Sequence, residues 1–224
     1  MAQEIQFTGN SHSCCVCFVD VVDSTKITAV EITNAEKIKR YYSIFINTMA
    51  AIARNFGATI IKNTGDSLVY YFPATSNFTH ISAFKDVLEC GLTMIAVNPI
   101  INAKLKQEEG LLPPLCYRIS ADYGRVEVAK SLTSTTEDLF GPIVSICSKI
   151  NSKAAPNEMV IGEGLYQIVK PSFEDNYIFN GVDEYSIDNN NFKHHYRVYS
   201  VANRDSNKNK NNNDTLSLYR NIIS

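Results

Sequence analysis

A run of β-branched and apolar residues from Cys14 to Val22 ends in charged side chains. Its second half reads CFVDVVDST (17–25) and carries Asp20 and Asp23 directly before two hydroxyl residues. Such a run is typical of a buried strand, and Ser24 can cap a helix that follows it. The chain must therefore pack a sheet around this strand, and the carboxylates at its end need a partner or a function.

Composition limits the classes of protein to consider. The chain has 224 residues, of which 45% are hydrophobic, enough for one domain with a sizeable core. A formal net charge of −2 gives no basic field that would attract nucleic acid or an anionic membrane surface. The N-terminus lacks a signal-peptide pattern, and no apolar stretch approaches the ~20 residues that span a bilayer. We expect a soluble, cytoplasmic protein that binds neither nucleic acid nor membrane.

Three of the six cysteines lie in the segment SHSCCVC (11–17). A zinc site would need a second Cys/His pair at ligand spacing, and the sequence contains none. Cys15 and Cys17 lie two apart in the expected strand, where they can serve as small apolar side chains. Reduced, structural cysteines fit a cytosolic compartment.

Hydrophobic periodicity and turn residues predict alternating strands and helices over residues 1–202. After the first strand we expect a long helix over 34–57, a hairpin over 58–72 that turns at NTG, and a second helical pattern from about 78 to 109. A strand pair turning at Tyr123-Gly124 follows, then a helix over 139–154 and a strand over 158–163. A helix over 164–170 and strands over 177–181 and 193–202 complete an α+β domain with one central sheet. The polar tract that begins NRDSNKNKNNND (203–214) predicts a separate tail over 203–224.

Carboxylates at the ends of two expected strands can be explained together as ligands of one cation. Asp20 ends the first strand and Asp66 follows the glycine of the hairpin turn, so the two can meet on neighbouring strands. Two hard oxygen ligands suit Mg²⁺ or Mn²⁺, and two buried like charges need a cation. Ser24 and Thr25 begin a helix whose backbone N–H groups can hold phosphate oxygens. Asp23 is expected to cap that helix, and either Asp20 or Asp66 alone would more simply cap a helix or close a turn.

Four segments resemble the catalytic domain of class III nucleotidyl (adenylate/guanylate) cyclases in order and approximate spacing. They are FVDVVDST (18–25), KNTGDSLVYYF (62–72), YRISADYGRVEVA (117–129) and DLFGPIVSICSKINSKAAPNEMVIG (138–162). The resemblance covers most of residues 14–202. It implies a ferredoxin-like βαββαβ core with one central, mainly antiparallel sheet, and a head-to-tail homodimer with its active sites between the chains.

The resemblance also implies a role for individual residues. Asp20 and Asp66 match the two metal-binding carboxylates, with the backbone carbonyl of Val21 also at the metal and two Mg²⁺ or Mn²⁺ ions per site. Lys62 and Asp138 match the pair that reads the base in adenylate-specific members. A lysine donor beside a carboxylate acceptor complements N1 and the 6-amino group of adenine, whereas guanine presents the opposite pattern. Taken alone, Lys62 would be a solvated strand residue and Asp138 a helix cap.

Two positions depart from the family pattern. Ser145 replaces the asparagine that the family commonly has, and it can donate only one hydrogen bond to the ribose. Lys149 replaces the transition-state arginine, so it keeps the positive charge but loses the planar fork that holds two phosphate oxygens. Lys193 lines up with the triphosphate-binding lysine. The two replacements leave open a domain that has lost catalysis.

These observations predict a cytoplasmic, homodimeric adenylate cyclase that converts ATP to 3′,5′-cyclic AMP and pyrophosphate, with activity lowered by Ser145 and Lys149. Alternatives are a weak or inactive cyclase-like module that binds nucleotide or dimerises, and a cyclase for GTP or a pyrimidine nucleotide. A polymerase-palm or diguanylate cyclase domain shares the general core, but no GGDEF-like hairpin stands where NTGDS (63–67) lies.

Overall fold

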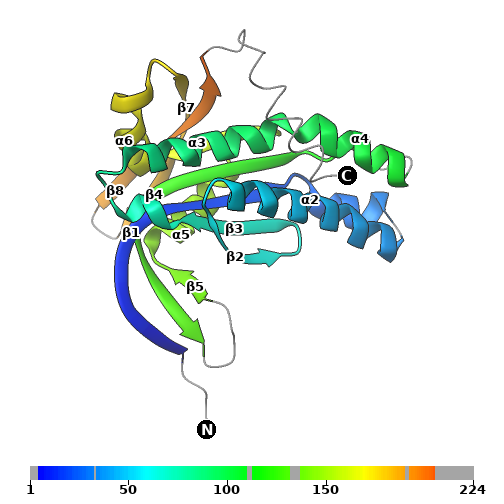
Figure 1. Cartoon of the computed structure of the whole chain (residues 1–224), viewed down its shortest axis with the longest axis horizontal. Helices are drawn as coiled ribbons and strands as arrows, with labels where there is room; N and C mark the ends of the chain where they lie inside the picture. Colours follow the sequence, from blue (N-terminus) through cyan, green and yellow to red (C-terminus); the bar gives the residue numbers. More distant parts are fainter. Residues whose placement is uncertain (1–4, 33, 110–112, 132–136, 190–191, 205–224) are drawn as a thin grey trace.

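The computed structural model describes residues 5–32, 34–109, 113–131, 137–189 and 192–204. Most of the expected tail, 205–224, lies outside the described residues, so the boundary at residue 202 stays a prediction. The described chain forms one sheet with helices against it (Figure 1). None of the described helices combines the length and the apolar character needed to cross a bilayer.

The sheet has the strand order β2-β3-β1-β4-β6-β8-β7, and β5 pairs with β4 outside this path. All its strand pairs are antiparallel except β4 with β6, which confirms the α+β class and the mainly antiparallel sheet. The strands are β1 (Ile5–Val21), β2 (Thr59–Thr64), β3 (Ser67–Phe72), β4 (Tyr117–Ser131), β5 (Glu137–Phe140), β6 (Glu158–Gly162), β7 (Tyr177–Asn189) and β8 (Phe192–Asn203).

Helices cover both faces of the sheet. In Figure 1, α2, α3 and α4 lie in front of it, whereas α5 lies behind. The helices are α1 (Ser24–Lys26), α2 (Ala35–Asn55), α3 (Ile81–Ala96), α4 (Asn98–Glu109), α5 (Pro142–Asn151) and α6 (Glu163–Phe173), with a π-helical turn at Ile27–Glu31 and a 3₁₀ turn at Pro73–Ser76.

β1 is buried on both faces, which explains its continuous apolar run. Cys15 and Cys17 belong to the main core with α2 and α3, whereas Cys14 and Val16 pack on the opposite face with Ile143 of α5. Side chains alternate along a strand, so Asp20 continues the Cys14 and Val16 face toward the α5 side. The buried cysteines act as core residues, and the described residues contain no cluster of metal-ligating side chains.

α2 follows the predicted helix closely. The side chain of Asn34 accepts hydrogen bonds from two backbone N–H groups of the first turn, and Gly57 adopts a φ of 81° just beyond the end. This is the expected pairing of an asparagine N-cap with a glycine stop. Helical spacing predicts a buried face with Ile38, Tyr42, Ile46, Met49 and Ile52. The structure instead fully buries Tyr41 and Phe45 together with Met49 and Ile52.

The structure corrects the predicted turn at Tyr123-Gly124, because β4 runs through it without a break. Gly124 pairs with Cys14 of β1 inside the ladder. A Cβ atom at Gly124 would lie 3.0 Å from the Cβ of Ile143, so the missing side chain lets α5 approach the sheet. A glycine inside a strand marks a close approach as often as a turn.

Further boundaries differ from the prediction, and β7 runs to Asn189, well beyond the expected end at residue 181. The helical pattern over 78–109 forms two helices, because Pro99 in the first turn of α4 cannot continue α3. β1 begins at Ile5 rather than at Cys14, and its first residues pair with the last residues of β4. β5 was not predicted, and it forms by pairing with β4 next to residues outside the described ranges.

A buried carboxylate joins three elements at the centre of the sheet. Asp122 of β4 is fully buried and accepts hydrogen bonds from the Tyr196 hydroxyl of β8 (2.7 Å) and from the backbone N–H of Tyr123 (2.8 Å) and Leu165 (3.1 Å). Burial raises the pKa of Asp122 to about 6, although these donors oppose the rise. Charge-assisted bonds compensate for taking a carboxylate out of water.

This arrangement predicts an asymmetry between two glycines. A Cβ atom at Gly162 would lie 2.0 Å from Oδ2 of Asp122, whereas one at Gly181 would meet nothing within 4 Å. We expect Gly162→Ala to lower the free energy of unfolding by about 1–3 kcal/mol through overpacking. Gly181→Ala, also on the sheet, should change it by less than about 0.5 kcal/mol. Urea denaturation of both variants checks this, and equal stability would contradict the described packing around Asp122.

Candidate active site

The two predicted metal carboxylates lie at one end of the central strands. Asp20 is the penultimate residue of β1 and pairs with Ser67 of β3, the residue that follows Asp66. The Asp66 carbonyl accepts a hydrogen bond from the N–H of Val21 at 3.2 Å. Gly65 allows this tight turn because its φ is 67°. The hairpin turn is therefore docked against the end of β1.

The electrostatics of this pair favour a cation. Burial and the neighbouring Asp66 raise the pKa of Asp20 to about 6, and Arg118 only partly opposes them. Two carboxylates with substrate oxygens completing the shell are a common way to bind Mg²⁺. No group of three or more His, Cys, Asp or Glu gathers among the described residues, and metal binding by this carboxylate pair stays a prediction.

Arg118 belongs to this neighbourhood and was missed by the sequence analysis. It is the direct strand partner of Asp20 across β1 and β4. Its Nε is buried and has no hydrogen-bond partner among the described residues. A buried donor without a partner is costly, and a carboxylate or phosphate oxygen would satisfy it. The signal in the sequence is an arginine inside the otherwise apolar strand pattern YRISA (117–121).

Lys62 and Asp138 form an ion pair between β2 and β5. The Lys62 Nζ donates to Oδ1 of Asp138 at 2.9 Å and to Oδ2 at 3.1 Å, and Oδ1 also accepts from the Leu139 N–H. The two side chains are 47% and 42% exposed, so solvent screens the pair and its stabilisation is small. The alternative of Asp138 as a helix cap is wrong, because it lies in β5 and Gly141 occupies the N-cap of α5.

Ser145 and Lys149 lie on the exposed face of α5. The opposite face is anchored by Asn151, whose Nδ2 donates to the carbonyls of Phe18 (3.5 Å) and Arg118 (3.3 Å). Phe18 lies two residues before Asp20 on β1, and Arg118 on β4 is the strand partner of Asp20. The anchor therefore fixes α5 on the two strands that carry the carboxylate end of the site.

Two more contacts hold α5 in the same place. The Ser120 hydroxyl of β4 donates to the Cys147 carbonyl at 2.8 Å, and the Cys147 thiol donates to the Val16 carbonyl at 3.2 Å. Asn151 Nδ2 also reaches Ser120 Oγ at 3.3 Å. No sequence pattern predicts this network, because an asparagine at a helix end and a serine in a strand have many other uses.

The segment after β1 differs from the predicted helix start. Asp23 occupies the N-cap position with a left-handed backbone (φ 55°, ψ 31°) and makes no side-chain capping bond, so the expected caps by Asp23 and Ser24 are wrong. α1 has only three residues and continues as the π-helical turn. Phosphate binding by Ser24 and Thr25 stays a prediction.

Lys193 lies in β8 opposite Asp188 of β7, in the outer part of that hairpin. Its side chain lies outside the described residues. Nearby, His195 contacts Glu184 across the strands at 3.2 Å, with both side chains exposed, as expected for a strand-edge histidine. The role of Lys193 stays a prediction.

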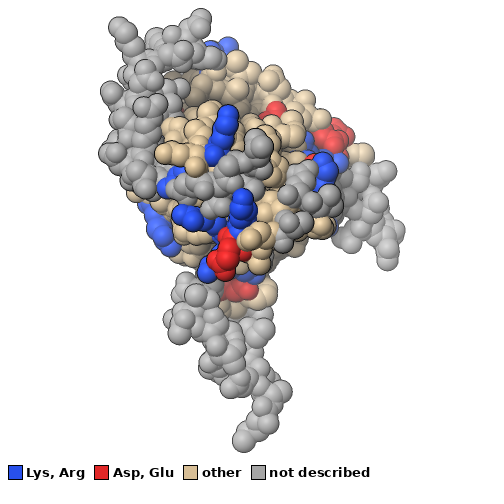
Figure 2. Space-filling view, turned by 90° about the vertical axis from the view of Figure 1, so that its right-hand side faces the viewer, with Lys and Arg blue, Asp and Glu red and all other residues tan. Residues whose placement is uncertain are grey.

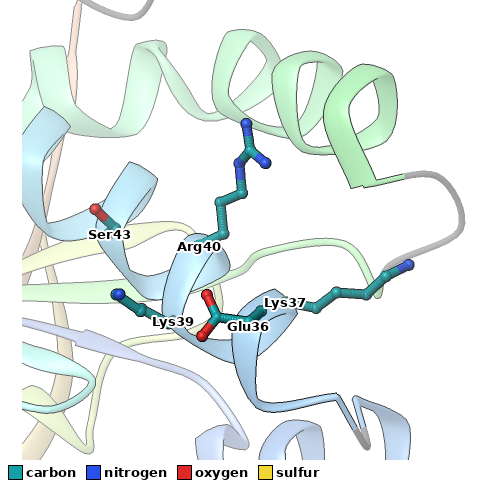
Figure 3. A pocket seen from close by; sticks show the side chains of 5 residues that line it. All are labelled: Glu36, Lys37, Lys39, Arg40 and Ser43. Carbon is teal, nitrogen blue, oxygen red and sulfur yellow. The ribbon is translucent and has the colours of Figure 1, made fainter.

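A cavity of about 300 Å³ lies elsewhere, on the outer side of α2. Figure 3 shows its lining, with Arg40 extending toward α4, and Figure 2 shows basic side chains beside a smaller acidic group on this end of the molecule. None of the described residues that line it belongs to the predicted site; they are Glu36, Lys37, Lys39, Arg40 and Ser43. The carboxylate pair and the Lys62–Asp138 pair do not line this cavity.

Comparisons with known proteins agree with this geometry. The sequence profile of the family described as "Adenylate and Guanylate cyclase catalytic domain" matches residues 8–203. A curated relative, the cytidylate cyclase of Staphylococcus aureus, is 26% identical over 171 residues, which are 72% of this chain and 38% of the relative. The chain therefore spans about two fifths of that relative's length.

Solved structures have the same fold. The guanylyl cyclase Cya2 superposes with a TM-score of 0.74 at 20% identity, covering 90% of this chain and 97% of that one. The adenylyl cyclase CyaB from P. aeruginosa gives a TM-score of 0.72 at 20% identity, covering 89% and 96%. With a family profile that matches most of its length, the chain belongs to the class III nucleotidyl cyclases, as a catalytic domain of the adenylate and guanylate cyclase type.

Proposed function

We propose that this domain is an adenylate cyclase that converts ATP to 3′,5′-cyclic AMP and pyrophosphate in a homodimer. The observation that carries the choice of base is the contact between Lys62 and Asp138, which holds a donor and an acceptor side by side. Adenine presents an acceptor at N1 beside a donor at its 6-amino group, and this pair complements both. The pair is half-exposed and weak, so a base can separate the two groups.

A second candidate is a cyclase for CTP. Cytosine presents an acceptor at N3 beside its 4-amino donor, which is the same pattern as adenine on a smaller ring. The relationship to a cytidylate cyclase favours this candidate over GTP and UTP, whose bases carry a carbonyl in place of the amino group. We place ATP first because the resemblance assigns Lys62 and Asp138 to adenine.

Asp20 and Asp66, with the carbonyl of Val21, are the groups that would hold Mg²⁺ or Mn²⁺, two ions per active site. Bound there, a divalent ion would act as a Lewis acid on the ribose 3′-oxygen and neutralise charge on the triphosphate. Burial and Asp66 raise the pKa of Asp20 even though Arg118 opposes the rise, so an added cation would relieve the charge on this pair, which supports this assignment. Class III cyclases generally use divalent metals.

The remaining residues would orient the nucleotide and offset its charge. The 3′-oxygen, whose proton passes to solvent, forms a bond to the α-phosphorus while the bond from the α-phosphorus to the bridging oxygen breaks. Pyrophosphate leaves with that oxygen, so positioning and charge are the main requirements. Ser145 would donate to the ribose and Lys149 would face the α-phosphate. Ser24 and Thr25 offer backbone N–H groups to the phosphates, and Lys193 a charge.

The replacements on α5 argue for a slow enzyme. Lys149 cannot make the bidentate contact of an arginine, and Ser145 is shorter than asparagine. Loss of one transition-state donor typically lowers the rate by about 10² to 10³. The carboxylates and the Lys62–Asp138 pair argue against a module that only binds nucleotide or only dimerises.

A nucleotide panel tests the proposed reaction. Purified protein with Mn²⁺ should convert ATP to its 3′,5′-cyclic monophosphate and pyrophosphate, with CTP as the next best substrate and GTP and UTP as the poorest. Chromatography of the products and an Asp66→Ala control provide the measurement. Turnover of GTP or UTP alone would contradict the assigned role of Lys62 and Asp138.

The pKa of Asp20 predicts a pH-dependent effect of its replacement. This pKa is about 6 in the folded protein and 3.8 as the ordinary value, so ionisation of Asp20 works against folding. The penalty is absent below about pH 4, grows up to about pH 6 and is complete above it. Without metal, Asp20→Asn should therefore be more stable than wild type at pH 7.5, by about 1 kcal/mol once solvent screening is allowed for, and the difference should vanish toward pH 4.

Added Mn²⁺ should reverse this order, because it stabilises only a protein that can bind it. Thermal unfolding at pH 7.5 with and without Mn²⁺ measures the effect, and Asp23→Asn is the control for a nearby carboxylate outside the pair. Equal Mn²⁺ stabilisation of wild type and Asp20→Asn would show that the carboxylate pair is not the metal site.

A subunit-mixing experiment tests whether each site is built from two chains. Asp66→Ala removes the metal side and Lys62→Glu the base side, so each homodimer should be inactive. After random exchange about half of the dimers are mixed, each with one intact site of two, and activity should recover to roughly a quarter of wild type. Mixing Asp66→Ala with Asp20→Ala should recover nothing, because both lack the same side. A mixture of complementary variants that stays inactive after verified exchange would refute the shared site.

A further inference from the structure

The chain leaves the metal-binding strand through a turn with an uncommon backbone. Asp23 has a φ of 55° and a ψ of 31°, the left-handed region, although it is not glycine. Such conformations carry a cost and persist where surrounding contacts hold them. Because Asp20 and Val21 lie just before this turn, whatever holds the turn also holds the end of the metal site.

Two hydroxyl groups hold the carbonyl that follows the turn. The Ser24 carbonyl accepts from Thr28 Oγ1 at 3.0 Å, within the same helical segment, and from the Tyr42 hydroxyl at 3.4 Å. The Thr28 bond is local, since the residues are four apart. The backbone N–H of Ile27 also donates to this carbonyl, and among the described residues the bond from Tyr42 is the one that ties it to the long helix α2.

Tyr42 also lies within electrostatic reach of the carboxylate pair. Burial, Asp66 and Asp20 together raise the pKa of the Tyr42 hydroxyl above its ordinary value of 10. The hydroxyl therefore keeps its proton at neutral pH and acts as a donor. It stands at the junction of α2, the turn at Asp23 and the two carboxylates.

We infer that Tyr42 is a positioning residue for the metal site: its hydroxyl ties the Ser24 carbonyl to α2 and keeps the end of β1, with Asp20 and Val21, in the conformation that binds the cation. This inference rests on the proposed metal role of Asp20 and Asp66. Without this hydrogen bond, the turn would populate other conformations. The apparent affinity for metal would then be reduced to the intrinsic affinity multiplied by the fraction of molecules that keep the binding-competent conformation.

The neighbouring tyrosine supplies a matched control. Tyr41 lies on the same helix, packs edge-on against Tyr42, and donates its hydroxyl to the Pro113 carbonyl at 3.5 Å. Tyr41→Phe and Tyr42→Phe therefore each remove one hydroxyl that donates a long hydrogen bond to a backbone carbonyl. Ile27 also packs in the core beside α2, but among the described hydrogen bonds the one from Tyr42 joins the Ser24 carbonyl to α2.

The test is direct Mn²⁺ binding, measured by electron paramagnetic resonance without nucleotide, on wild type, Tyr42→Phe, Tyr41→Phe and Asp66→Ala. We expect Tyr42→Phe to weaken Mn²⁺ binding by about 2- to 10-fold, the range that one ordinary hydrogen bond provides. Tyr41→Phe should bind as wild type does. In the cyclase assay, Tyr42→Phe should need more Mn²⁺ for half-maximal activity and regain wild-type kcat at saturating Mn²⁺.

The outcomes separate the inference from the proposed function. If Asp66→Ala loses Mn²⁺ but Tyr42→Phe binds it like wild type, the inference is wrong and the metal site stands. If Asp66→Ala binds Mn²⁺ as tightly as wild type, the proposed metal site itself fails. If Tyr42→Phe lowers the melting temperature more than Tyr41→Phe, or if saturating Mn²⁺ does not restore activity, the hydroxyl has a general structural role and the inference is overturned.

Discussion

The antiparallel pairing of β1 with β4, buried on both sides, is the constraint on which the rest of this structure depends. It places Asp20 opposite Arg118 at one end of the sheet, and it presents the carbonyls to which Asn151 anchors α5. Both faces of β1 require cover, so α2 and α3 pack on one side and α5 on the other. The carboxylate end and the helix that carries Ser145 and Lys149 are thus fixed to the same two strands, although they lie on different elements.

A single chain presents the predicted site in two separate parts. The carboxylate pair lies at the β1 end, the Lys62–Asp138 pair spans β2 and β5, and the described cavity on α2 includes none of them. Catalytic domains of this family act as dimers on nucleotide substrates, and a partner chain would explain why the pieces need not meet within one chain. In the proposed function, the half-exposed Lys62–Asp138 ion pair would be weak enough for a base to replace.

Local signals predicted much of the fold, whereas the contacts that hold the site are long-range. The apolar run ending at Val22 and the glycines at 57 and 65 located β1, α2 and the first hairpin. The predicted turn at Gly124 was wrong, because the sequence alone does not distinguish a glycine that makes room for Ile143 from a glycine that bends the chain. The carboxylates and the Lys62–Asp138 pair came from motif resemblance. Arg118 left a signal as an arginine inside an apolar strand, whereas the roles of Asn151 and Tyr42 could not be predicted, since their hydrogen-bond partners lie on other elements.

The central claim is that the carboxylate pair of one chain and the Lys62–Asp138 pair of another hold the two ends of one nucleotide. Anomalous diffraction from crystals grown with Mn²⁺ and a non-cyclisable ATP analogue tests it most directly. The account predicts a manganese peak between Asp20 and Asp66, with the adenine against Lys62 and Asp138 of the neighbouring subunit. Manganese bound elsewhere, or the nucleotide seated in the cavity on α2, would contradict it.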